Sequence, residues 1–294
     1  MSVNIIKDAS NAKVDIVLVH GLKHDDQENW TSAESSVFWP EKLLPSQVPD
    51  ARIIAFEYDE ANIDSFWNEE DLIADISDDL VNELMGERRG DKAERPLIFI
   101  AHCVGGLALI RACQHEKKKQ LVNSVQGIIL LGTPHFQPET LSEAGKYFQL
   151  AGKQIPSASD LEELSQFILK IPQNFAQLRQ AAPIKVECFY EGAPMKLNDQ
   201  EVKIVEVSVA NMPGGSPATR LAGNHYQMSR FASDKDKDFK KVYRVLQEWV
   251  EDLPEPEKEG TVNNISNASF AGSTNSGYQL GQNVGNQTGF VFGR

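Results

Sequence analysis

Three residues that lie far apart in the chain have the types that nucleophilic catalysis requires. Cys103 supplies a thiol, Glu191 a carboxylate and His225 an imidazole. A thiolate attacks a carbonyl carbon readily when a histidine takes its proton and an acid orients that histidine. The order nucleophile, acid, histidine, with each residue placed after an expected strand, predicts a single catalytic site at one edge of a sheet.

The segment around Cys103 indicates how the nucleophile would be presented. An apolar run at 97–100 is followed by Ala-His-Cys-Val-Gly-Gly at 101–106 and by an expected helix at 107–113. Small residues two places before and after the central residue permit the sharp strand-to-helix turn known as a nucleophile elbow. The alternative is an inert buried thiol, but a cysteine between histidine and Val-Gly-Gly at such a junction favours catalysis.

A second glycine-containing turn follows the apolar run at 14–19. Gly21 would let the backbone approach a substrate, so that the amide of Leu22 could bind developing negative charge together with the amide of Val104. We expect His102 and His135 to be walls of the same substrate pocket rather than bases.

The identity of the acid has alternatives. Glu206 and Asp199 lie near Glu191 in the sequence, although Glu206 falls inside an expected strand at 202–209. His225 could instead be a solvated loop residue, but its position after the last expected strand favours a catalytic role.

The elements that must position these residues follow from the hydrophobic pattern. Continuous apolar runs predict strands that are buried on both faces, as in a parallel sheet, at 14–19, 51–58, 97–100, 125–131 and 184–190. Helical periodicity occurs at 73–84, and a closing helix is expected at 239–249. Residues 136–182 read as a helical insertion or cap over the site. We therefore predict an α/β-hydrolase fold at 1–250, with a mostly parallel sheet flanked by helices.

Composition excludes several other classes of function. The net charge of -13 and the pI near 5.0 disfavour nucleic acid as a partner. The three cysteines form no CxxC pair, so neither a disulfide framework nor a metal site is indicated, and no cofactor is expected. Without a signal peptide or a long apolar stretch, we expect a cytoplasmic protein.

The sequence changes character after residue 250. Residues 251–260 are an acidic, proline-containing linker, and 261–294 are rich in Asn, Gln, Gly and Ser with spaced apolar residues. One interpretation is a disordered low-complexity tail. The other is a tail that forms cross-β assemblies, because amide ladders and apolar side chains without proline suit stacked strands.

Several linked motifs resemble one family. The segments VLVHGL, ARIIAFEYD, IFIAHCVGG, GIILLGTPH, FYEG and NHYQM resemble the SERAC/SesB-like branch of fungal α/β hydrolases, lipase-like proteins associated with cytosolic NLR immune receptors. The resemblance covers about residues 14–250 and implies a lipid or ester hydrolase domain. Ala101 replaces the usual glycine and Cys103 the usual serine, and these departures put lipase turnover, but not the fold, in question.

The tail carries a second resemblance. Residues 276–289, centred on Tyr278, Gln279, Leu280 and Gly281, resemble the pseudo-palindromic amyloid motif of fungal NLR signalling, which is similar to the RHIM core of animal necroptosis proteins. This resemblance implies self-assembly through the tail and a partner, such as an NLR, that carries a matching motif.

Together these features predict a cytosolic cell-death effector that acts on an ester or lipid substrate, is activated or recruited by amyloid templating, and associates with a membrane after assembly. Two alternatives stay open. One is an inactive hydrolase-fold scaffold that signals through its tail, and the other is an ordinary carboxylesterase with an irrelevant tail.

Overall fold

The computed structural model describes residues 1–9, 11–22, 26–58, 70–115, 119–152, 154–164 and 166–254. The chain divides into two units, Met1–Pro254 and Glu255–Arg294. The expected amyloid motif at Tyr278, Gln279, Leu280 and Gly281 lies outside the described residues and stays a prediction.

The first unit is built on a seven-stranded sheet with the strand order β1-β3-β2-β4-β5-β6-β9. Only β1 runs antiparallel to its neighbour, β3, and every other adjacent pair is parallel. The strands are β1 (Ser2–Lys7), β2 (Val14–Val19), β3 (Ala51–Glu57), β4 (Leu97–His102), β5 (Val125–Leu131), β6 (Lys185–Tyr190) and β9 (Thr219–Arg220), with a separate hairpin of β7 (Met195–Leu197) and β8 (Gln200–Val202). The predicted mostly parallel sheet is confirmed, whereas the antiparallel edge strand β1 was not predicted.

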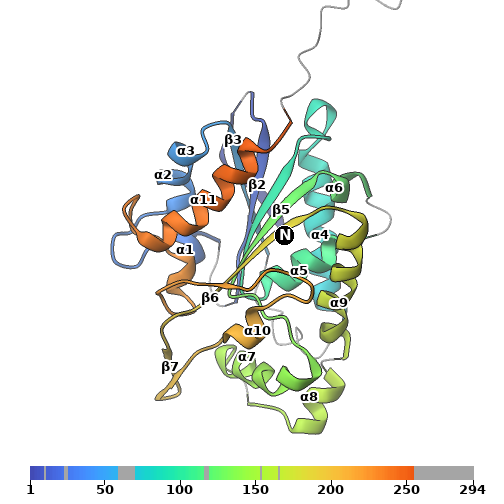
Figure 1. Ribbon diagram of the computed structural model, residues 1–294, viewed down its shortest axis with the longest axis vertical. Coiled ribbons are helices and arrows are strands. Elements are labelled where there is room, and N and C mark those ends of the chain that lie inside the picture. The colour runs from blue at the N-terminus through green and yellow to red at the C-terminus, as the bar shows by residue number, and fades with distance from the viewer. Residues whose placement is uncertain are drawn as a thin grey trace, which may run out of the picture. The chain divides into compact units, whose positions relative to one another are not determined.

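Helices cover both faces of this sheet (Figure 1). They are α1 (Asp26–Trp30), α2 (Trp39–Lys42), α3 (Leu44–Gln47), α4 (Glu70–Glu87), α5 (Gly105–Ala112), α6 (Lys119–Asn123), α7 (Gly145–Leu150), α8 (Ala158–Leu164), α9 (Gln166–Ala181), α10 (Val207–Ala210) and α11 (Lys237–Glu251), with 3-10 turns η2 (Gly90–Lys92), η4 (Pro138–Ala144) and η5 (Gln227–Ser229). Among the described residues, none of these helices combines the length and apolar character needed to cross a membrane.

The pleat of β2 shows why two helical layers form. All six of its residues are buried, including Asp15, and the other five are apolar. Val17 and Val19 belong to the core that contains α4, α5 and α9, whereas Ile16 and Leu18 belong to the core that contains Trp39 and α11. Because successive side chains of a strand point to opposite faces, a strand with apolar residues on both faces needs a helical layer on each side.

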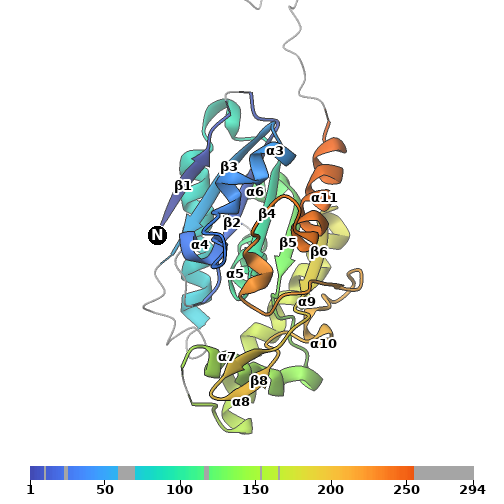
Figure 2. The same ribbon diagram turned by 90° about the vertical axis from the view of Figure 1, so that its left-hand side faces the viewer.

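The turn η4 and the helices α7 and α8 lie at one end of the sheet, where the hairpin β7–β8 and α10 also gather, and α9 runs beside α5 (Figure 2). The predicted helical insertion falls in this region. The apolar face of α9 contributes Ile168, Ile171 and Phe175 to the core.

The expected last strand at 202–209 is wrong. The hairpin strand β8 ends at Val202, and residues 207–210 form α10. Glu206 is not inside a strand but precedes α10 as its N-cap residue. The last strand of the sheet is β9, whose two residues pair with Phe189 and Tyr190.

A buried ionic cluster lies on β2, centred on Asp15. Its carboxylate is fully buried and pairs with Arg52 at 2.9 Å, Arg88 at 2.6 Å and Arg95 at 3.0 Å. Burial alone would raise the pKa of Asp15, but the hydrogen bonds and charges of these arginines hold the pKa below its usual value. The cluster ties β2, β3 and the end of α4 together.

We expect Asp15→Asn to destabilise the fold by about 3–5 kcal/mol, because it leaves buried guanidinium groups without their carboxylate. Since the folded-state pKa is lowered, the contribution of Asp15 is present above its unfolded pKa and is lost as pH falls through the folded value. Urea unfolding of wild type at pH 7 and pH 3 measures this loss. Between the same two pH values, the free energy of unfolding of Asp15→Asn should fall less than that of wild type. The control, Asp50→Asn, breaks an exposed 3.8 Å pair with Lys13 and should change stability little.

Candidate active site

Cys103 lies at the tip of the predicted elbow, directly after β4 and two residues before α5. Its φ of 55° is a left-handed conformation that non-glycine residues rarely adopt, and its amide donates to the carbonyl of Leu131 at 2.9 Å. A Cβ atom at Gly105 would overlap the carbonyl oxygen of His20. The turn can therefore close only with a glycine two residues after Cys103.

The loop after β2 lies directly against Cys103. A Cβ atom at Gly21 would come within 2.6 Å of the Cys103 Cβ atom, so the two backbones approach as closely as a glycine permits. Leu22 follows in this loop, and Val104 is the N-cap residue of α5. Both residues are buried. The structure thus brings the two expected oxyanion donors to the two segments that flank the nucleophile.

Tyr58, just beyond β3, fixes the start of that loop. Its hydroxyl donates to the carbonyl of His20 at 2.9 Å, and its amide donates to His20 Nε2 at 3.3 Å. The two rings stack with centroids 4.0 Å apart. The direction in which the chain leaves β2 is therefore set by contacts with the neighbouring strand.

The structure brings His225 and Glu191 together. Glu191 follows β6, and its Oε2 atom lies 3.5 Å from His225 Nδ1. Its Oε1 atom accepts a 2.8 Å hydrogen bond from the amide of Val205, in the segment that was expected to be a strand. That bond holds the carboxylate so that its other oxygen faces the imidazole. The competing acids are elsewhere, with Glu206 at the start of α10 and Asp199 between β7 and β8.

His225 is fully buried, and burial and nearby charges shift its pKa in opposite directions. Burial lowers the pKa of an imidazole, but the interactions with Cys103 and then Glu191 outweigh it and raise the pKa of His225 to about 10. Neither of its ring nitrogens has a hydrogen bond of standard geometry within the described residues. Catalytic hydrogen bonds are often long before substrate binds.

Tyr147 on α7 is a neighbour that the sequence did not reveal. Its ring meets the ring of His225 edge-on, with centroids 6.3 Å apart, and it also meets Phe136. Burial, followed by the negative charges of Cys103 and Glu191, raises the pKa of Tyr147 well above its usual value. Its hydroxyl is therefore neutral. One aromatic residue among several in a helical segment gave no signal of this placement.

The two histidines that were expected to line the pocket have other surroundings. His102 lies between Asn29 and the backbone of His225, at 2.8 Å and 2.9 Å. His135 lies 3.8 Å from the Cys188 sulfur, and its amide donates to Val209 of α10. Burial lowers the pKa of His135 to about 3, so it is neutral. Both rings are fully buried.

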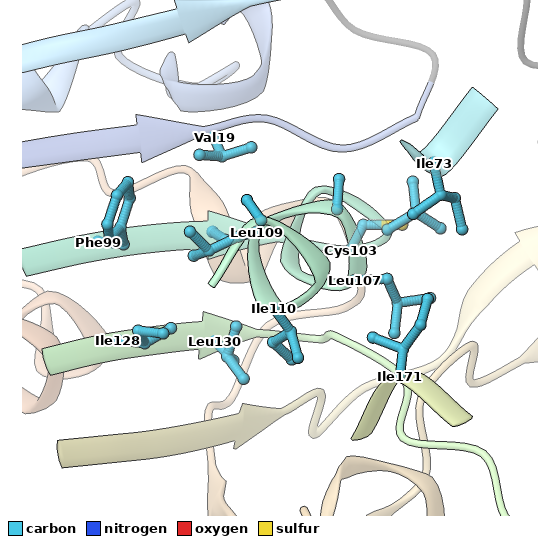
Figure 3. Packing of buried hydrophobic residues seen from close by; sticks show 14 of the residues in the cluster. Val19, Ile73, Phe99, Cys103, Leu107, Leu109, Ile110, Ile128, Leu130 and Ile171 are labelled. Atoms are coloured by element: carbon cyan, nitrogen blue, oxygen red, sulfur yellow. The ribbon is translucent and has the colours of Figure 1, made fainter. Parts of the chain in front are cut away.

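The surroundings of Cys103 are apolar. Figure 3 shows Ile73, Leu107 and Ile171 around it, and all belong to the same buried cluster. Cys103 is 1% exposed, and His225 and Glu191 are fully buried. Ile73 and Ile171 also line a cavity of about 440 Å³ between α4, α5 and α9, and a second cavity of about 710 Å³ lies between η4, α8 and α9. The arrangement can carry acyl transfer, but in this conformation the three side chains are closed to solvent.

The raised pKa of His225 gives a prediction for stability. A folded-state pKa of about 10, above the usual 6.5, stabilises the fold fully below pH 6.5, and this contribution is lost as pH rises through 10. We expect the free energy of unfolding of wild type to fall more steeply between pH 7 and pH 10 than that of His225→Gln. The control is His115→Gln, at a histidine that pairs with Asp78 elsewhere. Equal slopes for wild type and His225→Gln would contradict the assigned pKa.

Comparison with known proteins found a family model that matches a segment near the end of the chain and relatives of similar sequence. Residues 262–289 match a family model described as "SesB domain on fungal death-pathway protein". The chain is 33% identical to Protein SERAC1 of Mus musculus over 149 residues, which are 42% of this chain and 22% of the mouse protein. It is 26% identical to Protein SERAC1 of Danio rerio over 211 residues, which are 62% of this chain and 31% of that protein. The chain therefore spans less than a third of the length of these relatives.

Solved structures with a similar fold include a lipase-esterase related protein from Clostridium acetobutylicum, with 9% identity and a TM-score of 0.48 over 84% of this chain and 98% of that one. An α/β hydrolase superfamily protein from Enterococcus faecalis is 13% identical, with a TM-score of 0.48 over 83% of this chain and 92% of that one.

The fold itself is established by the sheet and the turn. The mostly parallel sheet, the strand-to-helix turn at Cys103 and the later positions of Glu191 and His225 are the features of an α/β hydrolase. Residues 262–289 thus match the SesB domain model, and the body that precedes them has the α/β-hydrolase fold and is similar in sequence to Protein SERAC1.

Proposed function

We propose that the body of this chain is an ester hydrolase that uses Cys103 as its nucleophile. The observation that carries the proposal is the meeting of three strand ends in one buried site: Glu191 Oε2 lies 3.5 Å from His225 Nδ1, the ring of His102, next to Cys103, lies 5.0 Å from that of His225, and Cys103 raises the pKa of His225. In this mechanism the Cys103 thiolate attacks the ester carbonyl while His225 holds the proton. The amides of Leu22 and Val104 stabilise the oxyanion.

The remaining steps follow from the same groups. Collapse of the tetrahedral intermediate breaks the bond to the alcohol, and His225 gives its proton to the departing oxygen. The product is a thioester on Cys103. His225 then takes a proton from water, which attacks the thioester and releases the acid and the thiolate. Glu191 orients the imidazole throughout. The apolar surroundings of Cys103 favour an ester with an apolar acyl group.

We further propose that the chain acts in a fungal death pathway and that its tail controls the body. The match of residues 262–289 to the SesB domain supports this role. In the proposal, a partner with a matching motif, such as an NLR, templates the tail into a cross-β assembly. Clustering then raises the local concentration of hydrolase bodies at a membrane or relieves an inhibited state.

Two other functions predict different results. A scaffold without turnover would share the fold and the assembly but not the hydrolysis, and the closed site supports it. An ordinary carboxylesterase would hydrolyse esters without assembling. Activity and assembly must therefore be measured separately.

The role of Cys103 is tested by comparing Cys103→Ala and Cys103→Ser with wild type on short-chain esters and phospholipid vesicles. We expect Cys103→Ala to lower kcat/KM by about 10³-fold or more, because the nucleophile is lost. Cys113→Ala is the matched control, since burial raises the pKa of that thiol to about 12 and keeps it inert. Equal rates for wild type and Cys103→Ala would eliminate nucleophilic catalysis at this position.

The role of the tail is tested by removing residues 261–294 and following fibre formation after seeding with fibrils of a 262–289 peptide. The truncated chain should not assemble, and its esterase rate should not change on seeding, because the segment that matches the SesB domain has been removed. The control is a full chain whose tail has the same composition in scrambled order. This chain should not assemble if the order of residues in the tail, and not its composition, directs assembly. Seeded assembly of the truncated chain would count against the proposal.

A further inference from the structure

A closed set of buried hydrogen bonds joins the loop that carries Leu22 to the loop that carries His225. We propose that Asn29 and His102 are positioning residues that hold the oxyanion loop and the catalytic imidazole in register with Cys103. This inference rests on the proposed hydrolase function, because it assigns these residues a task within the same site. Asn29 was not among the candidates that the sequence suggested.

Asn29 contacts the oxyanion loop directly. Its Oδ1 atom accepts a hydrogen bond from the amide of Gly21 at 3.2 Å and lies 2.8 Å from His102 Nδ1. The bond from Gly21 fixes the peptide that precedes Leu22. Because Gly21 already lies against Cys103, holding this peptide sets where the Leu22 amide points.

His102 contacts the loop of the catalytic imidazole. Its Nε2 atom lies 2.9 Å from the backbone carbonyl of His225, within hydrogen-bond distance, and the two rings lie with centroids 5.0 Å apart. His102 is also bonded covalently to Cys103. One residue therefore links the nucleophile to the backbone of its base.

Ser229 completes the set. Its hydroxyl donates to the backbone carbonyl of Asn29 at 2.9 Å, and its own carbonyl accepts from the Trp39 indole at 2.8 Å. The loops after β2, β4 and β9 are thus connected in a ring through α1.

Burial gives this ring its stiffness. Asn29, His102, His225 and Ser229 are all fully buried. Hydrogen bonds that water cannot replace hold geometry more strictly than exposed ones, and their loss leaves buried polar groups unpaired. Apolar residues could fill the same space without connecting the three loops. The polar identity of Asn29 and His102 therefore points to alignment rather than to packing.

The experiment compares Asn29→Ala, His102→Ala and His102→Gln with wild type. Each is measured for kcat and KM on a short-chain ester, for the rate of Cys103 alkylation by iodoacetamide between pH 5 and pH 9, and for amide hydrogen exchange at residues 21 and 22. Two matched controls remove comparable groups elsewhere. Asn211→Ala loses an Oδ1 acceptor that bonds the Ala218 amide at 2.8 Å, and His115→Ala loses a half-buried imidazole.

We expect Asn29→Ala to lower kcat about 100-fold with KM changed less than threefold, because the Leu22 amide is held less firmly where it would bind the oxyanion in the transition state. The same variant should speed amide hydrogen exchange at residues 21 and 22 about tenfold. His102→Ala should lower kcat similarly and slow alkylation at pH 6 about tenfold, because His225 is displaced from the thiol. In His102→Gln, the side-chain amide of the introduced glutamine can still donate to the His225 carbonyl. This variant should therefore keep the wild-type alkylation profile while its kcat falls as in Asn29→Ala.

Other outcomes overturn the inference. The inference is wrong if folded Asn29→Ala and His102→Ala keep the wild-type kcat, hydrogen exchange and alkylation rate. It is also wrong if Asn211→Ala and His115→Ala lose as much activity as these variants. If wild type and Cys103→Ala hydrolyse esters equally, the proposed function fails, but hydrogen exchange and alkylation still decide whether Asn29 and His102 position the two loops.

Discussion

The close approach of two backbones at the ends of β2 and β4 is the constraint on which the site depends. A Cβ atom at Gly21 would press on Cys103, and one at Gly105 would overlap the carbonyl of His20. Adjacent parallel strands lie less than about 5 Å apart, so the loops that leave them can meet only where side chains are missing. The left-handed backbone of Cys103 is sustained by this packing.

The positions of His225 and Glu191 depend on a second constraint, near the edge strand β9. The edge strand β9 has only two residues, and Val205 lies between the separate hairpin β7–β8 and α10, outside the main sheet. Its amide bonds to the Glu191 carboxylate at 2.8 Å, so backbone outside the sheet orients this side chain. The His225 loop is held from the opposite side by His102.

Charge and burial act against each other on the pKa of His225. Burial opposes the charged form of His225, yet the interactions with Cys103 and Glu191 prevail. Burial raises the pKa of Cys113 and of Cys188 to about 12, and the imidazole beside Cys188, that of His135, is itself held neutral by burial. The apolar cluster around Cys103 supplies the low dielectric that strengthens these interactions.

The sequence by itself determined the parallel strands, the elbow and the order of Cys103, Glu191 and His225, because unbroken apolar runs and small residues at fixed spacing are local signals. It did not determine the fate of residues 202–209, since their alternation suits a strand until Glu191 captures the Val205 amide. Nor did it reveal Asn29 or Tyr147. Such contacts join residues distant in the chain, and only tertiary packing decides which of many polar or aromatic side chains meets the site.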